Sequence, residues 1–363
     1  MKRINVISSS LPDYNLYIDK IKSLWDTKIL TNNGDYHQQL ENKLLDKLKI
    51  PNITITTNGH IGLEYALETL DFKGEIITTP FTFASTTQAI IRKGFKPVFC
   101  DISFDDYNID TKLIAKLVTK NTVAIMPVHV YGNPCNVDEI DRIAKKYSLK
   151  VIYDAAHAFG VEVNGKGIGS FGDISMFSFH ATKVFHTIEG GALSYNDSLL
   201  KVKLESLKNF GLTTSGQVEN FGGNGKLDEF RSAMGLCNLE IIDNEIDKRK
   251  KVAERYEQLL SDVEGIRIVK SLPNVKRNYA YMPVLFDGYK KNRDEIFEEL
   301  KKENIFARKY FYPLISDFIC YKDKYDSNKT PIAKHVAKNV LALPLYSDLS
   351  SEDIDRICKI ILR

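Results

Sequence analysis

The segment KVIYDAAHAFG, residues 150–160, decides how the middle of the chain folds, because a short β-rich run ends there on a carboxylate. Residues 150–153 form the run, and Asp154 follows at its carboxyl end. That end is the edge at which ligands bind in open α/β sheets. A carboxylate buried there is costly to desolvate unless a cationic group meets it. A metal ion, an arginine or a protonated ring nitrogen would serve, and a metal is disfavoured because no further ligand lies at suitable spacing nearby.

A second stretch, FSFHATKVFHTIEGG at residues 177–191, places a lysine among small, hydroxyl and aromatic residues. Lys183 has no acidic neighbour in this stretch before Glu189. Two interpretations are open. Lys183 is either an ordinary loop cation, which is the commoner case, or an amine that its pocket makes nucleophilic, of the kind that forms Schiff bases. The stretch alone favours the first interpretation, so the surrounding chain has to decide between them.

Short β-rich runs alternate with helical periods from about residue 50 to residue 160, which indicates βαβ units on a largely parallel sheet. The predicted strands are residues 53–57, 75–79, 97–100, 122–130 and 150–153. Helical faces follow Asn58-Gly59 and Pro80, and Asn136 caps a further helix. Asn164-Gly165 predicts a hairpin turn. The sequence therefore predicts an α/β fold.

A long, highly charged helical pattern from residue 226 to about residue 260 leads into a C-terminal part with its own elements. Strands are predicted near residues 266–269 and 280–285, and helices over residues 293–302 and from residue 352. We predict a large domain over residues 1–245, with a mostly parallel central sheet flanked by helices, and a smaller α+β domain over residues 246–363. The first residues, up to about residue 30, are predicted to pack on the small domain.

Two strand-to-helix junctions carry residues that packing alone explains poorly. Gly59, in Asn58-Gly59-His60, lets backbone N–H groups approach a phosphate at a helix N-terminus, although turns of this kind are common. Phe83, in TPFTFAST at residues 79–86, either packs in the core or covers a flat ligand ring. A nucleophilic lysine, a strand-end acid, an anion cradle and a covering aromatic together match the needs of pyridoxal 5'-phosphate (PLP), whose pyridine nitrogen requires a carboxylate partner.

The composition is that of an ordinary globular protein, with 43% hydrophobic and 27% charged residues. Because 50 Lys+Arg stand against 47 Asp+Glu, the charge gives no reason to invoke nucleic acid or an anionic membrane as a partner. The five cysteines are scattered and odd in number, which predicts free thiols in a reducing compartment. Neither a signal-peptide core nor a membrane-spanning stretch is evident, so a cytoplasmic enzyme is expected.

Two other kinds of site are disfavoured by spacing. The glycine-rich GKGIGSFG at residues 165–172 is superficially similar to a dinucleotide-binding loop, but it opens no helix. His129, His180 and His186 are residues of a type that binds metals, but their separations match no common ligand pattern. No metal is predicted.

The segments DAAHAFG (154–160), Gly172-Asp173, FSFHATK and Glu189-Gly190-Gly191 together resemble the DegT/DnrJ/EryC1/StrS family of sugar aminotransferases. The similarity extends over nearly the whole chain, through TPFTFAST, PVHVYGNP (127–134), GGNGKLDEFRSAMGL (222–236) and LPLYSDLSSEDIDRI (343–357). It implies an aspartate-aminotransferase-like fold, PLP fold type I, with PLP as the cofactor.

The resemblance assigns roles around the reacting end of the cofactor. Lys183 looks like the catalytic lysine that bonds to the cofactor aldehyde, and Asp154 like the partner of the pyridine nitrogen. His157 would lie near the 3-oxygen of the ring, and Phe83 is similar to the aromatic that stacks on it. Lys183 would also shuttle the proton during transamination.

The phosphate contacts follow in the same way. Ser178 and the backbone of Gly59 and His60 would hold the phosphate, and Asn224 resembles the asparagine that reaches into the neighbouring subunit's phosphate site. A homodimer with shared active sites is therefore implied. The chain departs from the family in two places: Asn58-Gly59-His60 replaces Ser-Gly-Thr, which removes a hydroxyl contact at position 60, and Gly225-Lys226 replace an aromatic and an arginine next to Asn224.

The resemblance implies transamination from L-glutamate, which leaves as 2-oxoglutarate, to C4 of a nucleotide-linked keto sugar. The lysine loop is most similar to enzymes that convert dTDP-4-keto-6-deoxyglucose into dTDP-4-amino-4,6-dideoxyglucose, a precursor type for surface polysaccharide such as the O-antigen of lipopolysaccharide. The alternatives are a C3 aminotransferase acting on a 3-keto sugar, and a PLP-binding dehydratase or non-catalytic homologue. The dehydrating branch of the family has histidine in place of the lysine, so Lys183 argues against that branch.

Contacts to the sugar or the nucleotide are the least constrained part of the prediction. The candidates are Tyr131, His186, Glu189, Tyr310 and Tyr312, of which the tyrosines are equally plausible as core aromatics.

Overall fold

The computed structural model describes residues 2–70, 72–270, 272–321 and 323–363. Within these ranges the central sheet has seven strands in the order β2-β10-β9-β6-β5-β3-β4. Their bounds are β2 Ile53–Thr56, β3 Glu75–Thr78, β4 Lys96–Phe99, β5 Thr122–Ile125, β6 Lys150–Asp154, β9 Ile174–Ser178 and β10 Gly191–Tyr195. The neighbouring pairs are parallel except those of β10, which runs antiparallel to β2 and β9. The predicted, largely parallel sheet is confirmed.

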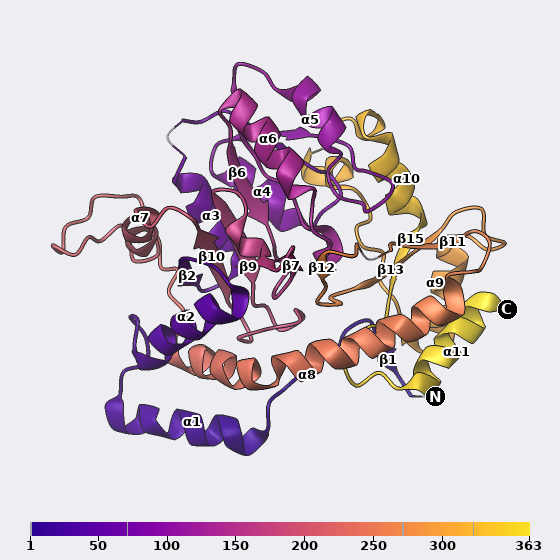
Figure 1. The fold of residues 1–363 in the computed structure, drawn as a ribbon, viewed down its shortest axis with the longest axis horizontal. Coiled ribbons are helices and arrows are strands. Elements are labelled where there is room, and N and C mark those ends of the chain that lie inside the picture. The colour runs from indigo at the N-terminus through magenta and orange to yellow at the C-terminus, as the bar shows by residue number, and fades with distance from the viewer. Residues whose placement is uncertain (1, 71, 271, 322) are drawn as a thin grey trace.

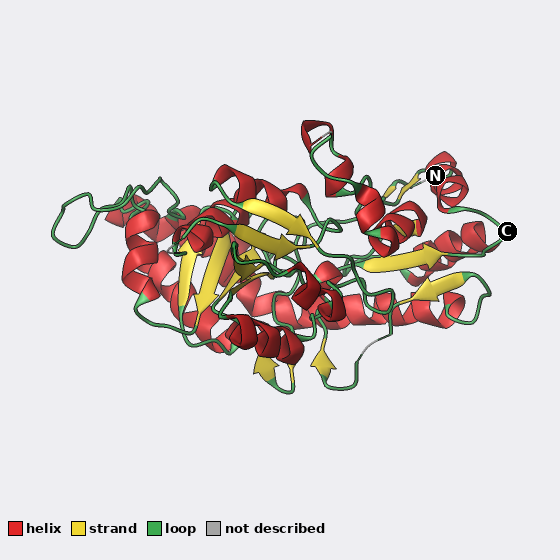
Figure 2. Ribbon diagram, turned by 90° about the horizontal axis from the view of Figure 1, so that it is seen from above, coloured by secondary structure: helices red, strands yellow, loops and turns green. Residues whose placement is uncertain are grey.

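Helices cover both faces of this sheet, as a mostly parallel sheet requires (Figures 1 and 2). Successive strand residues point to opposite faces, so Ile76 and Ile152 pack in one buried cluster and Ile77 and Val151 in the other. The first cluster includes residues of α3 (Gly59–Glu68), α4 (Ala84–Arg92) and α7 (Leu200–Leu207). The second includes residues of α2 (Asp35–Leu48), α5 (Thr111–Leu117) and α6 (Val137–Tyr147). Each fully buried aliphatic side chain contributes about 1.5–3 kcal/mol.

Two predicted boundaries in this part of the chain need correction. The strand predicted over residues 122–130 ends at Ile125, because Pro127 has no N–H for a ladder and the chain continues only through a single bridge between Val128 and Asp154. A short 3-10 turn, η1 (Val130–Gly132), follows. The long helix begins at Glu229 rather than residue 226, because the Asp228 side chain accepts a hydrogen bond from the N–H of Arg231 and so forms its N-cap.

The predicted hairpin at Asn164-Gly165 is confirmed. It joins β7 (Glu162–Val163) to β8 (Lys166–Gly167), and both turn residues have positive φ, 52° and 76°, as a two-residue hairpin turn needs. The third strand of this small sheet is β12 (Val275–Lys276), which pairs with β7.

Helix α8 (Glu229–Leu260) is a long rod of 32 residues that connects the two ends of the molecule (Figure 1). Its first half packs against α2 and against α1 (Tyr14–Thr27), where the Trp25 and Phe230 rings meet edge to face at 5.8 Å. Its second half packs against α11 (Ser351–Leu362). The proposed division after residue 245 falls inside this continuous helix, and it stays a prediction.

The C-terminal part has its own core around an antiparallel sheet, β11-β13-β15, with bounds Ile266–Ile268, Met282–Phe286 and Val340–Leu343. Helices α9 (Arg293–Lys302), α10 (Pro331–Asn339) and α11 accompany it, and α9 coincides with the predicted helix. Short 3-10 turns are η2 (Ile168–Ser170), η3 (Ile315–Asp317), η4 (Ile319–Tyr321) and η5 (Ser327–Lys329). The N-terminal strand β1 (Ile4–Asn5) pairs with β14 (Ile305–Phe306), so the start of the chain reaches this part. None of the helices in the described ranges has the length and apolar character to cross a membrane.

Candidate active site

A cavity of about 490 Å³ opens at the edge of the central sheet where β6 and β9 end and β2 leads into α3. Because β10 is antiparallel to its neighbours, its first residue, Gly191, lies at the same edge, paired with Thr56 and Ser178. The cavity brings together most of the residues predicted from the sequence: Gly59, His60, Phe83, Asp154, His157, Ser178, Lys183, Glu189 and Tyr310.

Asp154 lies buried at the end of β6 within a chain of hydroxyl groups. Thr86 Oγ1 donates to its carboxylate at 2.6 Å, and the N–H of Ala156 donates at 3.1 Å. Because the single proton of Thr86 is used in this way, Thr82 Oγ1, 2.9 Å away, must donate to Thr86. Burial raises the pKa of the Asp154 carboxyl, and the Thr86 hydroxyl and the positive charge of Lys183 oppose that rise. These donors thus orient the carboxylate, and no cationic side chain of the described residues forms an ion pair with it.

Lys183 extends into the same cavity from the loop between β9 and β10. Its Nζ donates to the Tyr281 hydroxyl at 3.3 Å, and Phe185 of the same loop stacks on the ring of Phe159. Burial is the main cause that lowers the pKa of the Lys183 amine to about 8. The surroundings are therefore those of an amine with a substantial neutral fraction near neutral pH rather than those of a solvated loop cation.

The start of α3 forms a cradle for an anion. Asn58 Oδ1 caps the helix by accepting the N–H of Ile61 at 2.9 Å, whereas the first-turn N–H groups of Gly59 and His60 have no intrahelical acceptor. A Cβ at Gly59 would lie 2.8 Å from Met176 Sδ and 3.2 Å from Ser178 Cβ, so any larger residue would displace side chains of β9. Gly191 is constrained likewise, since its Cβ would lie 2.5 Å from the Gly59 nitrogen. Small residues at both positions allow the helix start to approach the sheet edge.

Hydroxyl groups extend this cradle. Ser178 ends β9 beside Gly59, and Ser85 lines the cavity with its Oγ 2.8 Å from His60 Nδ1. The other ring nitrogen of His60 lies 3.3 Å from the Glu64 carboxylate. The His60 side chain is thus engaged by Glu64 and Ser85, which leaves the His60 backbone N–H and the Ser178 hydroxyl for the anion.

A pile of aromatic rings forms one wall of the cavity. The His157 ring is parallel to the Phe311 ring at 5.9 Å, and Phe311 stacks in turn on Tyr131 at 5.8 Å. Tyr281 meets the edge of His157 at 4.8 Å. Burial lowers the pKa of His157 well below its ordinary value, so the imidazole is neutral, and its buried Nδ1 has no hydrogen-bond partner among the described residues.

Phe83 stands at the mouth of the cavity, in the N-cap position of α4, and 55% of its side chain is exposed. The alternative that Phe83 packs in the core would require a buried ring. Its exposure supports the role of a cover for a flat ligand.

Four of the predicted residues do not line this cavity. His186 is buried behind it, where its Nε2–H donates to the Ser10 carbonyl at 2.6 Å and its Nδ1 accepts the N–H of Ile188. Tyr131 lies under Phe311, with its hydroxyl donating to the carbonyl of Tyr310. Tyr312 faces the other way, where its ring contacts the Arg293 guanidinium at 4.8 Å. The structure thus gives Tyr131 and His186 packing contacts within the chain.

Asn224 is the fourth of these residues. It lies on the long loop after α7, where it forms an isolated bridge with Asn209. Beside it, Lys226 Nζ donates to the Asn209 side chain at 2.8 Å, and a Cβ on Gly225 would lie 2.5 Å from the Tyr65 ring. The departure from the family pattern at Gly225-Lys226 is therefore accommodated by contacts within this loop and with α3.

Several residues of the cavity were not singled out from the sequence. They are Thr82, Ser85, Thr86, Thr182, Tyr281, Arg308 and Phe311. Thr82, Ser85 and Thr86 belong to TPFTFAST, and a hydroxyl in the first turn of a helix next to the ligand edge was a usable signal. Tyr281, Arg308 and Phe311 come from the C-terminal part, and no local pattern marks them.

The model of the DegT/DnrJ/EryC1/StrS aminotransferase family matches residues 15–362 of the chain. The protein belongs to this family. The predicted family is thus confirmed, and with it the prediction that the protein is a PLP-dependent sugar aminotransferase. The dTDP-4-amino-4,6-dideoxy-D-glucose transaminase of Shigella dysenteriae is 43% identical over 357 residues, which cover 98% of this chain and 97% of that protein. The transaminase of the same name from Escherichia coli is 43% identical over 367 residues, covering 99% and 98% of the two chains.

Solved structures of similar proteins have the same fold. The crystal structure of DesI in the presence of its TDP-sugar product superposes with a TM-score of 0.93 at 30% identity, covering 99% of this chain and 92% of that one. A PLP-dependent aminotransferase from Bacillus cereus superposes with a TM-score of 0.91 at 26% identity, and each chain is covered completely. The predicted aspartate-aminotransferase-like fold, PLP fold type I, is confirmed.

The cavity of this DegT/DnrJ/EryC1/StrS aminotransferase fits the cofactor of its family on three observations. The buried Asp154 carboxylate has no close cation among the described residues, and a protonated pyridine nitrogen supplies one. The first-turn amides of α3 and the neighbouring Ser178 form an anion site that suits a phosphate. The buried Nδ1 of His157 is free for a ring substituent.

Proposed function

We propose that the protein transfers the amino group of L-glutamate to C4 of a nucleotide-linked 4-keto-6-deoxy sugar, with dTDP-4-keto-6-deoxyglucose as the expected acceptor. The product would be dTDP-4-amino-4,6-dideoxyglucose, for use in surface polysaccharide. One observation carries the proposal: the Lys183 amine and the Asp154 carboxylate share one cavity with an anion cradle, in a chain 43% identical to transaminases named for this product. We also keep the prediction that the enzyme works in the cytoplasm.

When bound, PLP supplies an aldehyde that takes up the amino group and a ring that delocalises the electron pair left at the amine carbon. Asp154 would keep a proton on the pyridine nitrogen, and Thr86 would hold the carboxylate in the orientation this needs. The amides of Gly59 and His60, with Ser178, would bind the phosphate.

Lys183 would bind the cofactor aldehyde in the resting enzyme and, once released, carry the proton to and from the amine carbon. Its low pKa supports both tasks, because a neutral amine is the nucleophile and also the base. A positioned group of this kind contributes about 10² to 10⁴ in rate. Phe83 would cover the ring and exclude water. Glu189 and Tyr310, which line the cavity, remain the candidate contacts to the sugar among the residues named from the sequence.

An assay with L-glutamate and a panel of nucleotide-linked keto sugars tests the proposal. Conversion of the dTDP-linked 4-keto-6-deoxy sugar is expected, with 2-oxoglutarate formed in equal amount and the new amine located at C4 by NMR. An amine at C3, formed only from a 3-keto sugar, would support the alternative regiochemistry. Protein that carries a full complement of cofactor and converts none of the sugars would contradict the proposal.

A dehydratase or a non-catalytic homologue is the candidate from another class. A dehydratase would release water from the sugar and leave no new amine on it, and a non-catalytic protein would leave both substrates unchanged. Lys183 argues against the dehydratase, because the dehydrating branch has histidine in place of this lysine.

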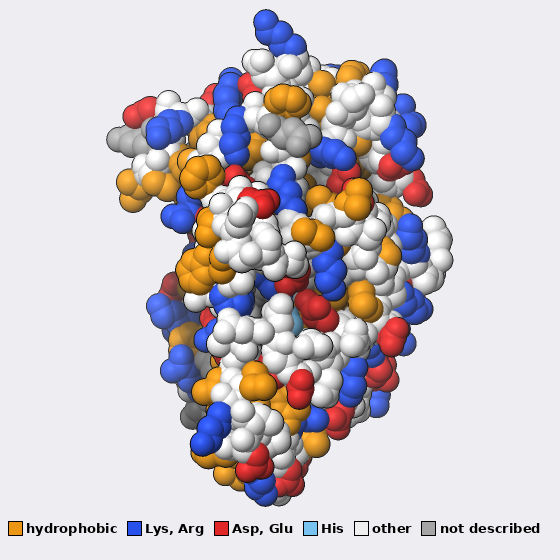
Figure 3. All heavy atoms as spheres, turned by 90° about the vertical axis from the view of Figure 1, so that its left-hand side faces the viewer, with side chains coloured by type: hydrophobic (Ala, Val, Ile, Leu, Met, Phe, Trp, Pro, Cys, Tyr) orange, Lys and Arg blue, Asp and Glu red, His pale blue; other side chains and the backbone are white. Residues whose placement is uncertain are grey.

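We further propose a homodimer with shared active sites. Asn224 does not line the cavity of its own chain, and the loop that carries it exposes Phe210 and Phe221, the latter at 96%. Figure 3 shows the end of the molecule that carries α7, where hydrophobic side chains lie among basic ones. Apolar side chains on a protruding loop support burial against a second copy of the chain.

A mixing experiment tests the sharing of sites. Asn224→Ala and Lys183→Ala homodimers are each expected to lose activity. If Asn224 completes the site of its partner, a heterodimer of the two variants has one site with both changes and one intact site. An equal mixture after exchange of subunits should therefore recover about a quarter of the wild-type activity. If Asn224 served the site of its own chain, every site of the heterodimer would be impaired and no activity would return.

A further inference from the structure

Arg308 lines the cavity but has no role in the chemistry proposed above. Its backbone pairs with that of Ala342 in β15 through two hydrogen bonds, at 3.0 and 2.8 Å. Its guanidinium lies 4.4 Å from the centre of the Tyr310 ring, which also lines the cavity. Backbone pairing and the aromatic ring therefore hold the guanidinium at the cavity wall without a substrate.

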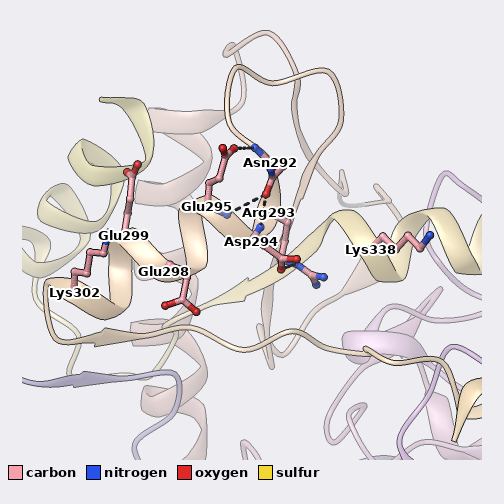
Figure 4. Close-up of a pocket in the computed structure, with 8 residues that line it drawn as sticks. All are labelled: Asn292, Arg293, Asp294, Glu295, Glu298, Glu299, Lys302 and Lys338. Carbon is pink, nitrogen blue, oxygen red and sulfur yellow. Dashed lines mark hydrogen bonds and ion pairs between the residues drawn. The ribbon is translucent and has the colours of Figure 1, made fainter.

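The neighbours of Arg308 in the chain are anchored on the other side, to the start of α9. Lys309 forms an ion pair with Asp294 at 2.6 Å, and the Tyr312 ring lies 4.8 Å from the Arg293 guanidinium. Figure 4 shows Arg293 and Asp294 next to each other at this end of α9. Lys309 and Tyr312 are thus turned toward α9, whereas Arg308 of the same segment faces the cavity.

The anchor itself is rigidly placed. Arg293 is buried, with 2% of its surface exposed, and its Nη1 donates to the carbonyls of Ala337 and Val340 at 3.1 and 3.2 Å. These carbonyls lie where α10 ends and β15 begins, and Val340 is two residues before the strand position that pairs with Arg308. Strand β15 thus holds both Arg308, through its backbone, and the anchor Arg293, through the Val340 carbonyl.

The Arg308 guanidinium has no ion-pair partner among the carboxylates of the described residues, in contrast to Lys309. A guanidinium presents five N–H donors in a planar fork that matches a carboxylate or a phosphate group. Its charge also reaches the reacting centre, since it adds to the lowering of the Lys183 pKa for which burial is the main cause. The start of α3, which lines another part of the cavity, already forms one anion site. Arg308 would therefore bind a second anion.

We propose that Arg308 binds an oxyanion of the substrate and thereby selects which molecules react in this cavity. The inference rests on the proposed function, because both substrates of that reaction carry such a group. The amino donor has carboxylates, and the nucleotide sugar has a diphosphate. The chemistry that the guanidinium recognises is the same in both, and binding measurements distinguish the two sources.

The test compares the cofactor-loaded wild type with Arg308→Gln and Arg308→Lys. Calorimetric titration with dTDP measures binding of the diphosphate, and the glutamate concentration at half-maximal rate in the absence of keto sugar measures binding of the donor. For Arg308→Gln, the dissociation constant of dTDP, the half-maximal glutamate concentration, or both should rise about 10- to 100-fold. This is the range for a hydrogen bond to a charged group. Arg308→Lys should recover part of the loss. A change with dTDP assigns the diphosphate, and a change with glutamate assigns the carboxylate.

The matched control is Arg142→Gln, an exposed arginine of α6 that pairs with Glu139 on the surface. It should match the wild type in both measurements. The inference is overturned if Arg308→Gln binds dTDP and glutamate within twofold of the wild type, or if the wild type binds neither. A wild type that binds dTDP and glutamate but converts no keto sugar would overturn the proposed function. The ratio of binding between Arg308→Gln and the wild type would still decide the role of Arg308.

Discussion

Replacing Lys183 by alanine is expected to reduce the rate of transamination by about 10⁴-fold or more, the upper end of what a positioned proton-transfer group contributes. The loss should be this large because one side chain performs two tasks, covalent attachment of the cofactor and movement of the proton. Steady-state kcat with saturating glutamate and keto sugar measures it. The cofactor should still bind through the α3 cradle and Asp154, with an altered absorbance because no lysine bond forms.

The low pKa of Lys183 predicts how cofactor capture depends on pH. With a pKa of about 8, roughly one amine in ten is neutral at pH 7, whereas an ordinary lysine is almost fully protonated there. The rate at which cofactor-free protein captures PLP should therefore rise through pH 7 and level off above pH 8. A rate that still rose steeply at pH 10 would show an unperturbed lysine.

Lys145→Ala is the matched control for Lys183→Ala. Lys145 lies on the exposed surface of α6 and pairs with Asp141. This variant should have wild-type activity and capture PLP at the wild-type rate. Activity above about 1% of the wild type in Lys183→Ala would contradict the role proposed for Lys183.

The strand-end carboxylate and the lysine were predictable from the sequence because each belongs to a local pattern. A β-rich run that stops on an acid places Asp154 at the ligand edge, whatever the rest of the chain does. Taken alone, Lys183 could be either a loop cation or a nucleophilic amine. The second interpretation was favoured only because the Asp154 carboxylate needed a cationic partner. The parallel sheet was predictable for the same reason, since alternating strand and helix periods are local.

The residues missed by sequence reasoning come from contacts between distant segments. Tyr281 lies close to Lys183 because the sheet of the C-terminal part docks beside the lysine loop. Neither Tyr281 nor Arg308 stands in a pattern that distinguishes it from an ordinary strand or loop residue. Thr86 could be placed near Asp154 only after the order of β3 and β6 in the sheet was known.

Two predicted element ends were wrong although the local sequence marks the true ones. Pro127 has no N–H to continue the ladder beyond Ile125, and the Asp228 side chain caps α8. His186 was a different case. It stands next to the lysine in the sequence, but it binds the Ser10 carbonyl and so links the lysine loop to the N-terminal segment. That contact is long-range, and the local sequence carries no record of it.

Replacing Asp154 by asparagine is expected to reduce kcat by about 10²- to 10³-fold, the usual effect of removing one preorganised electrostatic contact from a reacting centre. Asparagine has the same shape: its Oδ1 can accept the N–H of Ala156, while its Nδ2 would donate to Thr86, whose hydroxyl would then donate to Thr82. It carries no negative charge, so it cannot keep the pyridine nitrogen protonated. The ¹⁵N chemical shift of labelled PLP bound to the variant should report an unprotonated nitrogen, in contrast to the wild type.

The same substitution should leave the cofactor-free protein as stable as the wild type or more stable. Burial raises the pKa of Asp154, so the folded protein binds the proton more tightly than the unfolded chain, and stability falls as pH rises above the unfolded value of about 3.9. Asparagine removes that penalty, and any gain in Tm should be larger at pH 8 than at pH 4. Asp141→Asn, on the surface of α6, should change neither activity nor Tm. An Asp154→Asn enzyme that lost both activity and Tm would indicate a structural role for the carboxylate instead of an electronic one.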